Sequence, residues 1–103
     1  MYLTVFRNRK RPDMDIAAYA ADAERMERRA AAAAGFISIK TFHAEDGEVV
    51  TISEWESEAA AKAWGRDPDH AQVQARGKAE YYDSYTLYSV DDARVKHYAR
   101  ATV

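Results

Sequence analysis

Hydrophobic and polar positions along the chain follow two periods, and each change of period marks a predicted element. Alternation at every second residue over Tyr2–Arg9 predicts a strand rich in β-branched and aromatic residues. Pro12 would stop this strand, since proline cannot donate to a ladder. One face would carry Tyr2, Thr4, Phe6 and Asn8, and the other Leu3, Val5 and Arg7.

Apolar residues then recur at helical spacing and predict a helix over about 15–33. The stripe consists of Ile16, Tyr19, Ala23, Met26 and Ala30. Asp13 or Asp15 can cap its start, and Gly35 is typical of a helix C-terminus. Residues 36–43 and 48–55 return to strand-like composition, and Asp46-Gly47 between them favours a tight hairpin. These two strands are therefore predicted to be antiparallel neighbours.

A second helical region covers about 58–78, with Ser57 as its N-cap. Gly65 and Pro68 interrupt it, so we expect a helix over 58–64 and a further short helix over 69–78. The composition of residues 81–90 predicts the last strand. Residues 91–103 form a polar tail that either packs on a partner subunit or stays loose.

The predicted order is β-α-β-β-α-β, a split βαβ arrangement of the α+β class. This order indicates a ferredoxin-like domain over residues 1–90, with both helices on one face of a four-stranded antiparallel sheet. The other face keeps apolar side chains such as Leu3 and Val5, which would leave a large patch in water. The simplest cover is a second copy, so we expect a homodimer with its sheets face to face.

Composition narrows the function classes. With 103 residues, 48% hydrophobic and 31% charged, the chain fits one globular domain. A net charge of −2 argues against nucleic-acid binding. No apolar stretch approaches a bilayer span and no signal-peptide pattern is present, so we expect no membrane partner. The lack of cysteine excludes disulfides and suits a cytoplasmic protein.

A short basic run, consisting of Arg7, Arg9, Lys10 and Arg11, covers the end of the first strand. It is either a solvated strand end or a clamp for an anionic substrate. No phosphate loop, serine elbow or His-x-x-x-His pair is present. The histidines, His43, His70 and His97, show no metal-ligand spacing, so no metal site is predicted.

A cleft between helices and sheet is the remaining candidate site. Its predicted lining is Phe6, Asn8, Tyr19, Met26, Trp55, Trp64, Tyr81 and Tyr82. These residues form either ordinary core or an apolar pocket for a flat ligand. Asn8 would bond a ligand oxygen or the backbone at the strand end, because a buried amide needs a partner. His70 would be a helix-start residue bonded to local backbone, or a general base at the pocket mouth.

In order and spacing, the chain resembles the antibiotic biosynthesis monooxygenase (ABM) family of dimeric α+β barrel proteins over residues 1–90. The matching segments are Gly35–Ser38, Asp46-Gly47, Ile52–Ala59, Ala63-Trp64, Asp67–His70, Gln74, Gly77 and Tyr81-Tyr82. The resemblance implies a homodimer with a pocket in each subunit. It also implies oxidation of polycyclic phenols or anthrones by molecular oxygen, without metal or flavin. Asn8 and Trp64 would then be catalytic pocket groups, with His70 or a tyrosine as proton acceptor.

Two alternatives accompany this resemblance. A related branch degrades haem with an Asn on the first strand, a Trp on the second helix and a His ten residues later. Asn8 and Trp64 match that pattern, but the third position is Gln74, a poor axial ligand. Haem degradation is therefore placed below oxygenation without a cofactor. The other alternative is a small-molecule-binding or stress-related protein that catalyses no reaction.

Overall fold

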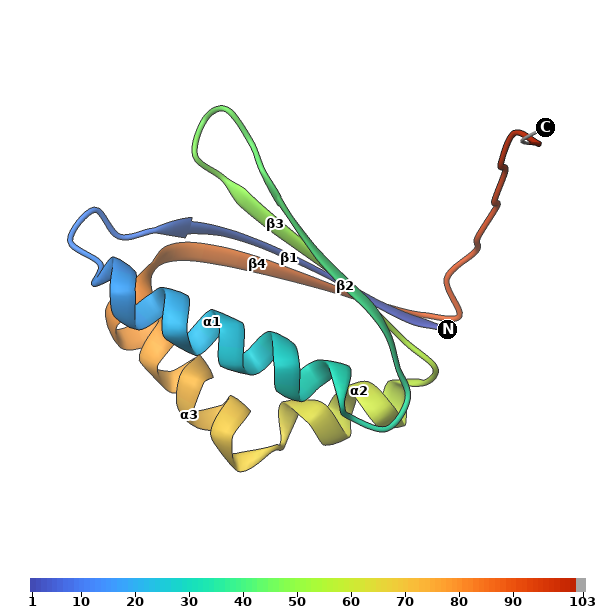
Figure 1. Ribbon diagram of the computed structural model, residues 1–103, viewed down its shortest axis with the longest axis horizontal. Coiled ribbons are helices and arrows are strands. Elements are labelled where there is room, and N and C mark those ends of the chain that lie inside the picture. Colours follow the sequence, from blue (N-terminus) through green and yellow to red (C-terminus); the bar gives the residue numbers. More distant parts are fainter. Residues whose placement is uncertain (102–103) are drawn as a thin grey trace.

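A four-stranded antiparallel sheet carries a layer of helices on one of its faces (Figure 1). The computed structural model describes residues 1–101. The elements, in chain order, are β1 (Tyr2–Lys10), α1 (Ile16–Ala31), β2 (Phe36–His43), β3 (Val49–Trp55), α2 (Glu58–Gly65), α3 (Pro68–Arg76), a π-helical turn (Gly77–Tyr81) and β4 (Tyr82–Asp91). The strand order is β2-β3-β1-β4, which confirms the predicted α+β, ferredoxin-like fold.

Strand register places the predicted helix-facing residues of β1 beside those of its neighbours. Thr4 lies opposite Ser53 of β3, and Phe6 lies opposite Thr51 of β3 and Leu87 of β4. Because side chains alternate along each strand, one face of the sheet is set by every second residue. The helices cover that face.

Helix α1 begins where Asp15 accepts a hydrogen bond from the backbone N–H of Ala18. Ile16 is 75% exposed, so the prediction that it belongs to the buried stripe is wrong. It lies in the first turn of α1, and the stripe towards the sheet starts at Tyr19. The helix ends at Ala31, two residues earlier than predicted. Gly35 then takes φ +80°, and a Cβ there would lie 2.5 Å from Cβ of Ala60.

The second helical region forms three pieces. The predicted break is present, because Asp67 accepts hydrogen bonds from the backbone N–H groups of Asp69 and His70 and starts a new helix. Tyr81 belongs to the π-helical turn and not to the last strand as predicted. Gly77 makes this turn possible, since a Cβ there would lie 2.6 Å from the ring of Tyr82.

The core between the layers is thin, as expected for a domain of this size. Its fully buried apolar residues are Ala30, Val49, Trp55 and Tyr81. Four ion pairs join α1 to α3 and its N-cap: Asp22–Arg76, Arg25–Asp69, Arg29–Asp69 and Arg29–Asp67. Contacts between charged groups thus connect the helices of this layer.

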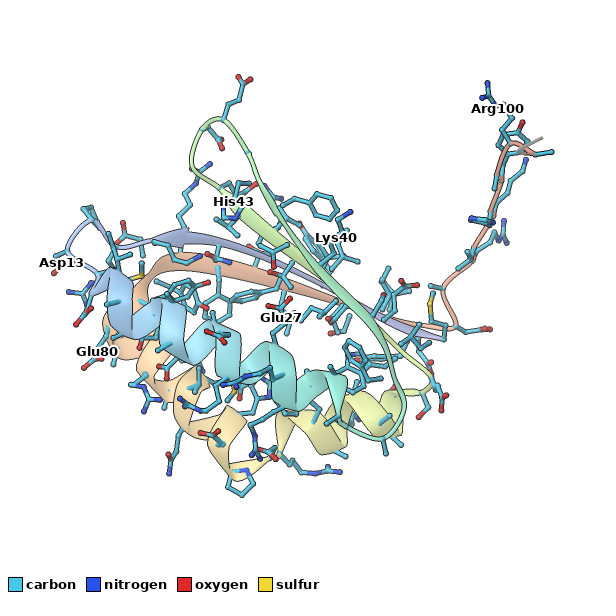
Figure 2. All side chains as sticks on the ribbon, viewed as in Figure 1. Asp13, Glu27, Lys40, His43, Glu80 and Arg100 are labelled. Carbon is cyan, nitrogen blue, oxygen red and sulfur yellow. The ribbon has the colours of Figure 1, made fainter. Side chains whose placement is uncertain are left out.

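The face of the sheet away from the helices is apolar and open. We call it the outer sheet face; it comprises Leu3, Val5, Phe42, Val50, Ile52, Tyr88 and Val90. Phe42 and Tyr88 are each 46% exposed. Lys40, on β2, extends on this side (Figure 2). In a single copy this face has no cover among the described residues.

Residues 93–101 have no regular structure and lead away from the domain (Figure 1). Val95 and Tyr98 in this segment are 66% and 83% exposed. Packing of the tail on a partner stays a prediction, and its residues 102–103 lie outside the described part of the chain. Within residues 1–101, no helix is both long and apolar enough to cross a bilayer. The cytoplasmic location stays a prediction as well.

Candidate functional site

A cavity of about 520 Å³ lies between the sheet and the helix layer. This volume is in the usual range for small-molecule sites. All the residues that the sequence predicted for the site line it: Phe6, Asn8, Tyr19, Met26, Trp55, Trp64, His70, Tyr81 and Tyr82. Their roles in binding or catalysis stay predictions. Glu27 also lines the cavity, although the helical pattern placed it off the buried stripe, and it extends from α1 towards the sheet (Figure 2).

Three stacked rings form one wall of the cavity. The ring centroids of Trp55 and Trp64 are 6.4 Å apart with planes at 23°, and those of Trp64 and His70 are 4.3 Å apart at 14°. Phe36 packs edge-on against Trp55. Trp64 therefore lies between Trp55 and His70, and the three rings together give the cavity an aromatic wall against which a further ring can pack edge-on or offset.

His70 is fixed through its backbone and its ring. Asp67 caps the helix turn that carries it, and Nδ1 lies 3.0 Å from the carbonyl oxygen of Trp64. A carbonyl only accepts, so Nδ1 carries the proton and Nε2 is left as the basic nitrogen. Burial lowers the pKa of His70 from its ordinary value, which keeps the ring neutral near pH 7. The predicted local backbone bond is therefore present, and the predicted role as a base is chemically open to Nε2.

Asn8 is only 3% exposed. Its Oδ1 accepts a hydrogen bond from Nζ of Lys10. The partner is thus a side chain two residues along the strand and not the backbone at the strand end, which was one of the two predicted alternatives. Contact with a ligand oxygen, the other alternative, stays a prediction.

Hydroxyl groups line the sheet side of the cavity, where a helix-covered sheet is ordinarily apolar. Thr4 and Ser53 share a hydrogen bond, as do Thr41 and Thr51, whose oxygens are 2.9 Å apart. Ser89 lines the same floor. This row of hydroxyl groups was not predicted from the sequence, although Thr51 and Ser53 alternate with Val50 and Ile52. Such a floor can bind a ligand that carries several oxygens.

A tyrosine cluster closes one end of the cavity. The rings of Tyr19 and Tyr81 meet edge to face at 5.3 Å, and Tyr82 packs edge-on against Phe6 at 5.4 Å. Burial raises the pKa of Tyr82 and of Tyr19. Both hydroxyls therefore stay protonated near pH 7, which favours His70 over these tyrosines as a proton acceptor.

Asp22 joins α1 to the π-helical turn beneath this cluster. It is 7% exposed, accepts two hydrogen bonds from Arg76, and accepts a third from the hydroxyl of Tyr81 at 2.6 Å. Asp22 was not among the predicted site residues. A signal was present, because Asp22 lies three residues after Tyr19 and four before Met26, on the apolar stripe. A carboxylate at such a position indicates a buried partner.

The residues of the basic run have different environments. Arg7 pairs with Glu48, Arg9 with Asp46 and Arg11 with Asp13, so these arginines do not form the predicted alternative of an anion clamp. The side chain of Lys10 contacts cavity residues, because Nζ donates to Oδ1 of Asn8 and lies over the rings of Tyr19 and Tyr82.

Within residues 1–101, the structure shows no group of three or more His, Asp or Glu side chains arranged to hold a metal ion. Gln74, the residue at the haem-ligand position, lines the cavity. A glutamine amide does not fit the role of an axial ligand. The nearby His70 has Nδ1 engaged with Trp64.

Comparison with known proteins gives a family match and a curated relative. The family model described as antibiotic biosynthesis monooxygenase matches residues 1–76. The uncharacterized protein YqjZ of Bacillus subtilis (strain 168) is 32% identical over 69 residues, a match that covers 67% of this chain and 60% of YqjZ. The chain thus spans about three fifths of the length of that relative.

Solved structures share the fold. Rv0793 from Mycobacterium tuberculosis superposes with a TM-score of 0.79 at 19% identity, covering 95% of this chain and 98% of that one. A crystal structure described as antibiotic biosynthesis monooxygenase gives a TM-score of 0.77 at 14% identity, covering 91% and 100%. At these identities the likeness shows a common architecture.

Proposed function

Because this chain belongs to the antibiotic biosynthesis monooxygenase family, we propose that it oxidises a flat phenol or anthrone with molecular oxygen and without metal or flavin. The observation that supports this proposal is the composition of the cavity wall. Trp64 and His70 present stacked rings, and Asn8 adds a buried amide to the same cavity. A flat aromatic substrate fits the rings of this wall, and a substrate oxygen that carries or develops a negative charge fits the amide.

The proposed reaction starts with proton removal. Nε2 of His70 takes a proton from the phenol or, in an anthrone, from the methylene carbon that lies across the central ring from the carbonyl, and the Asn8 amide stabilises the resulting oxyanion. The electron-rich anion then reduces oxygen, and a carbon–oxygen bond forms. For an anthrone, one oxygen atom enters the product as the quinone carbonyl and the other leaves as water. The substrate itself supplies the electrons.

An oxygen electrode tests this function. With dithranol as substrate in air, the protein is expected to consume one molecule of oxygen per anthrone and to yield the quinone, followed by its absorbance. Asn8→Ala is expected to lower the rate by about 10²–10³-fold, because one oxyanion donor is lost. Thr86→Ala is the matched control, since Thr86 lies opposite Arg7, on the other face of the sheet.

Two results would contradict the proposal. One is an absence of turnover across a panel of anthrones and hydroquinones that bind in the cavity, which would favour the alternative of a binding protein without catalysis. The other is an equal rate for wild type and Asn8→Ala. An activity that disappears after metal chelation would contradict the cofactor-free part alone.

We further propose that the protein is a homodimer whose outer sheet faces pack together. The support is the apolar, open character of that face, which includes Ile52, Phe42 and Tyr88. A pair of sheets packed face to face would bury these side chains, and a two-fold axis would place the same residues against each other.

Ile52→Glu is expected to weaken this dimer at least tenfold, because each copy would bring a carboxylate into an apolar contact. Sedimentation at micromolar concentration should give about twice the 11.6 kDa chain mass for wild type and the single mass for the variant. Ile16→Glu makes the same change at a residue of α1 that is 75% exposed, and it should leave the dimer intact. A wild-type monomer, or equal effects of the two variants, would contradict this interface.

A further inference from the structure

Lys10 places an ammonium group against three side chains that line the cavity. Nζ contacts Oδ1 of Asn8, lies 4.7 Å from the ring centroid of Tyr19 and 5.3 Å from that of Tyr82. These neighbours come from β1, α1 and β4, so the cation is held from three elements. Aromatic faces attract a cation, although they do not neutralise it.

No carboxylate within residues 1–101 lies within ion-pair distance of Lys10 Nζ. Arg7, Arg9 and Arg11, by contrast, each have an acidic partner. Burial lowers the pKa of Lys10, as expected for a cation that has lost water without gaining an anion. An anionic ligand in the cavity next to Lys10 would supply the missing partner.

The Lys10 contact also orients the Asn8 amide. An ammonium group only donates, so the atom facing it is the amide oxygen and the two N–H groups of Nδ2 point elsewhere. Among residues 1–101, the structure gives Nδ2 no hydrogen-bond partner, and no buried side-chain N or O atom is left unsatisfied. Since Asn8 lines the cavity, its free N–H groups are accessible from that space.

We infer that Lys10 is a positioning residue that holds the Asn8 amide as a donor towards the cavity and selects ligands with an anionic oxygen, that is, phenolates or enolates. The choice of these oxygen acids rests on the proposed function, which needs an ionised substrate. The binding preference itself requires no turnover. The cavity thus favours the ionised form of a flat aromatic acid over its neutral form.

Other charged side chains around the cavity bear on this preference. Asp22 and Glu27 of α1, Lys62 of α2 and Lys78 of the π-helical turn also line it. Asp22 is paired with Arg76, and Lys62 with Glu58. The experiment must therefore separate Lys10 from the general field of the cavity, for which Lys78 is the suitable comparison.

The probe is 1,2-dihydroxyanthraquinone (alizarin), a flat phenol whose visible absorbance changes when it ionises. Bound to wild type, its apparent pKa is expected to lie at least about one unit below that of the free dye, since an opposite charge nearby favours the anion. Lys10→Met should abolish most of this shift, which is an affinity loss of about tenfold for the anion. Affinity for 1,2-dimethoxyanthraquinone, which cannot ionise, should change less than about twofold.

Three variants complete the test. Lys78→Met removes a charge from the same cavity and Lys40→Met removes one from the outer sheet face (Figure 2), and both should keep the dye shift. Lys10→Arg keeps the charge and should retain part of the shift. The test therefore does not depend on Lys10→Met alone if that variant folds poorly. Unchanged side-chain NMR signals of the Asn8 amide in Lys10→Arg and Lys10→Met would overturn the positioning role.

The inference is wrong if alizarin does not bind, if it binds with an unshifted pKa, or if Lys78→Met and Lys10→Met act alike. A protein that shows the dye shift but oxidises no anthrone would contradict the proposed function and leave this inference standing. Conversely, turnover with an unshifted dye pKa would contradict this inference alone.

Discussion

Replacing Asp22 with alanine is expected to lower the free energy of unfolding by about 2–3 kcal/mol, because it removes the acceptor of two hydrogen bonds from Arg76 and leaves the buried hydroxyl of Tyr81 without a partner. Arg76 donates two hydrogen bonds to Asp22, and the hydroxyl of Tyr81 donates a third at 2.6 Å. Domains of this size have a total stability of only about 5–15 kcal/mol. The change would therefore remove a large share of the stability.

Acid should act on the same contact in wild type. The hydrogen bonds from Arg76, aided by Tyr81 and opposed by burial, lower the pKa of Asp22 from 3.8 to about 2. A carboxyl group whose pKa is lower in the folded state stabilises that state fully at pH values above its pKa in the unfolded state. This stabilisation is lost as the pH falls from about 4 through 2. The loss corresponds to about 2 kcal/mol.

Urea unfolding at pH 7 and at pH 3 measures both effects. Glu24→Ala is the matched control, since Glu24 is an exposed acid of the same helix, and it should change stability by less than about 0.5 kcal/mol. Tyr81→Phe should cost about 1.5–3 kcal/mol, because it removes one hydrogen bond to a charged group. A small loss in Asp22→Ala, similar to that of Glu24→Ala, would show that the network does not hold the helix layer.

Replacing His70 with alanine is expected to lower the rate of dithranol oxidation by about 10²–10⁴-fold, the usual contribution of a positioned general base. The structural reason is the tautomer. The Trp64 carbonyl, 3.0 Å from Nδ1, holds the proton on that nitrogen and leaves Nε2 basic. His43→Ala is the matched control, because His43 is an exposed histidine of β2.

The pH profile gives a separate readout for His70. Burial lowers its pKa below 6.5, opposed by the Trp64 carbonyl and the nearby Asp67 and Asp69. The neutral ring is the active form, so kcat/KM is expected to stay constant down to below pH 6.5 and to fall only where the ring takes up a proton. His70→Ala should flatten that acid limb. An acid limb that persists in the variant would assign it to another group.

The fold could be predicted from the sequence because each element carries its own local signal. The alternation of β1, the Asp46-Gly47 hairpin and the Ser57 cap each depend on neighbouring residues. The break between α2 and α3 follows from the proline chemistry at Pro68. Such features are determined by residues that are close in sequence and do not depend on contacts with distant parts of the chain.

Contacts between distant residues could not be predicted in the same way. The acid of Asp22 on an apolar stripe indicates a buried partner, but nothing in the local pattern selects Arg76 from the other arginines. The π-helical turn moved Tyr81 out of the predicted strand, because its side chain reaches Asp22 and Gly77 leaves room for Tyr82.

The ion pairs between α1 and the segment 67–76 bear on the register of these two segments. They run Asp22–Arg76, Arg25–Asp69 and Arg29–Asp67 along two antiparallel segments. A shift of α3 by one helical turn, about 5.4 Å, would separate all three of these pairs. The pattern of charges along the two segments therefore favours one register between them, and this register sets where along the cavity His70 lies.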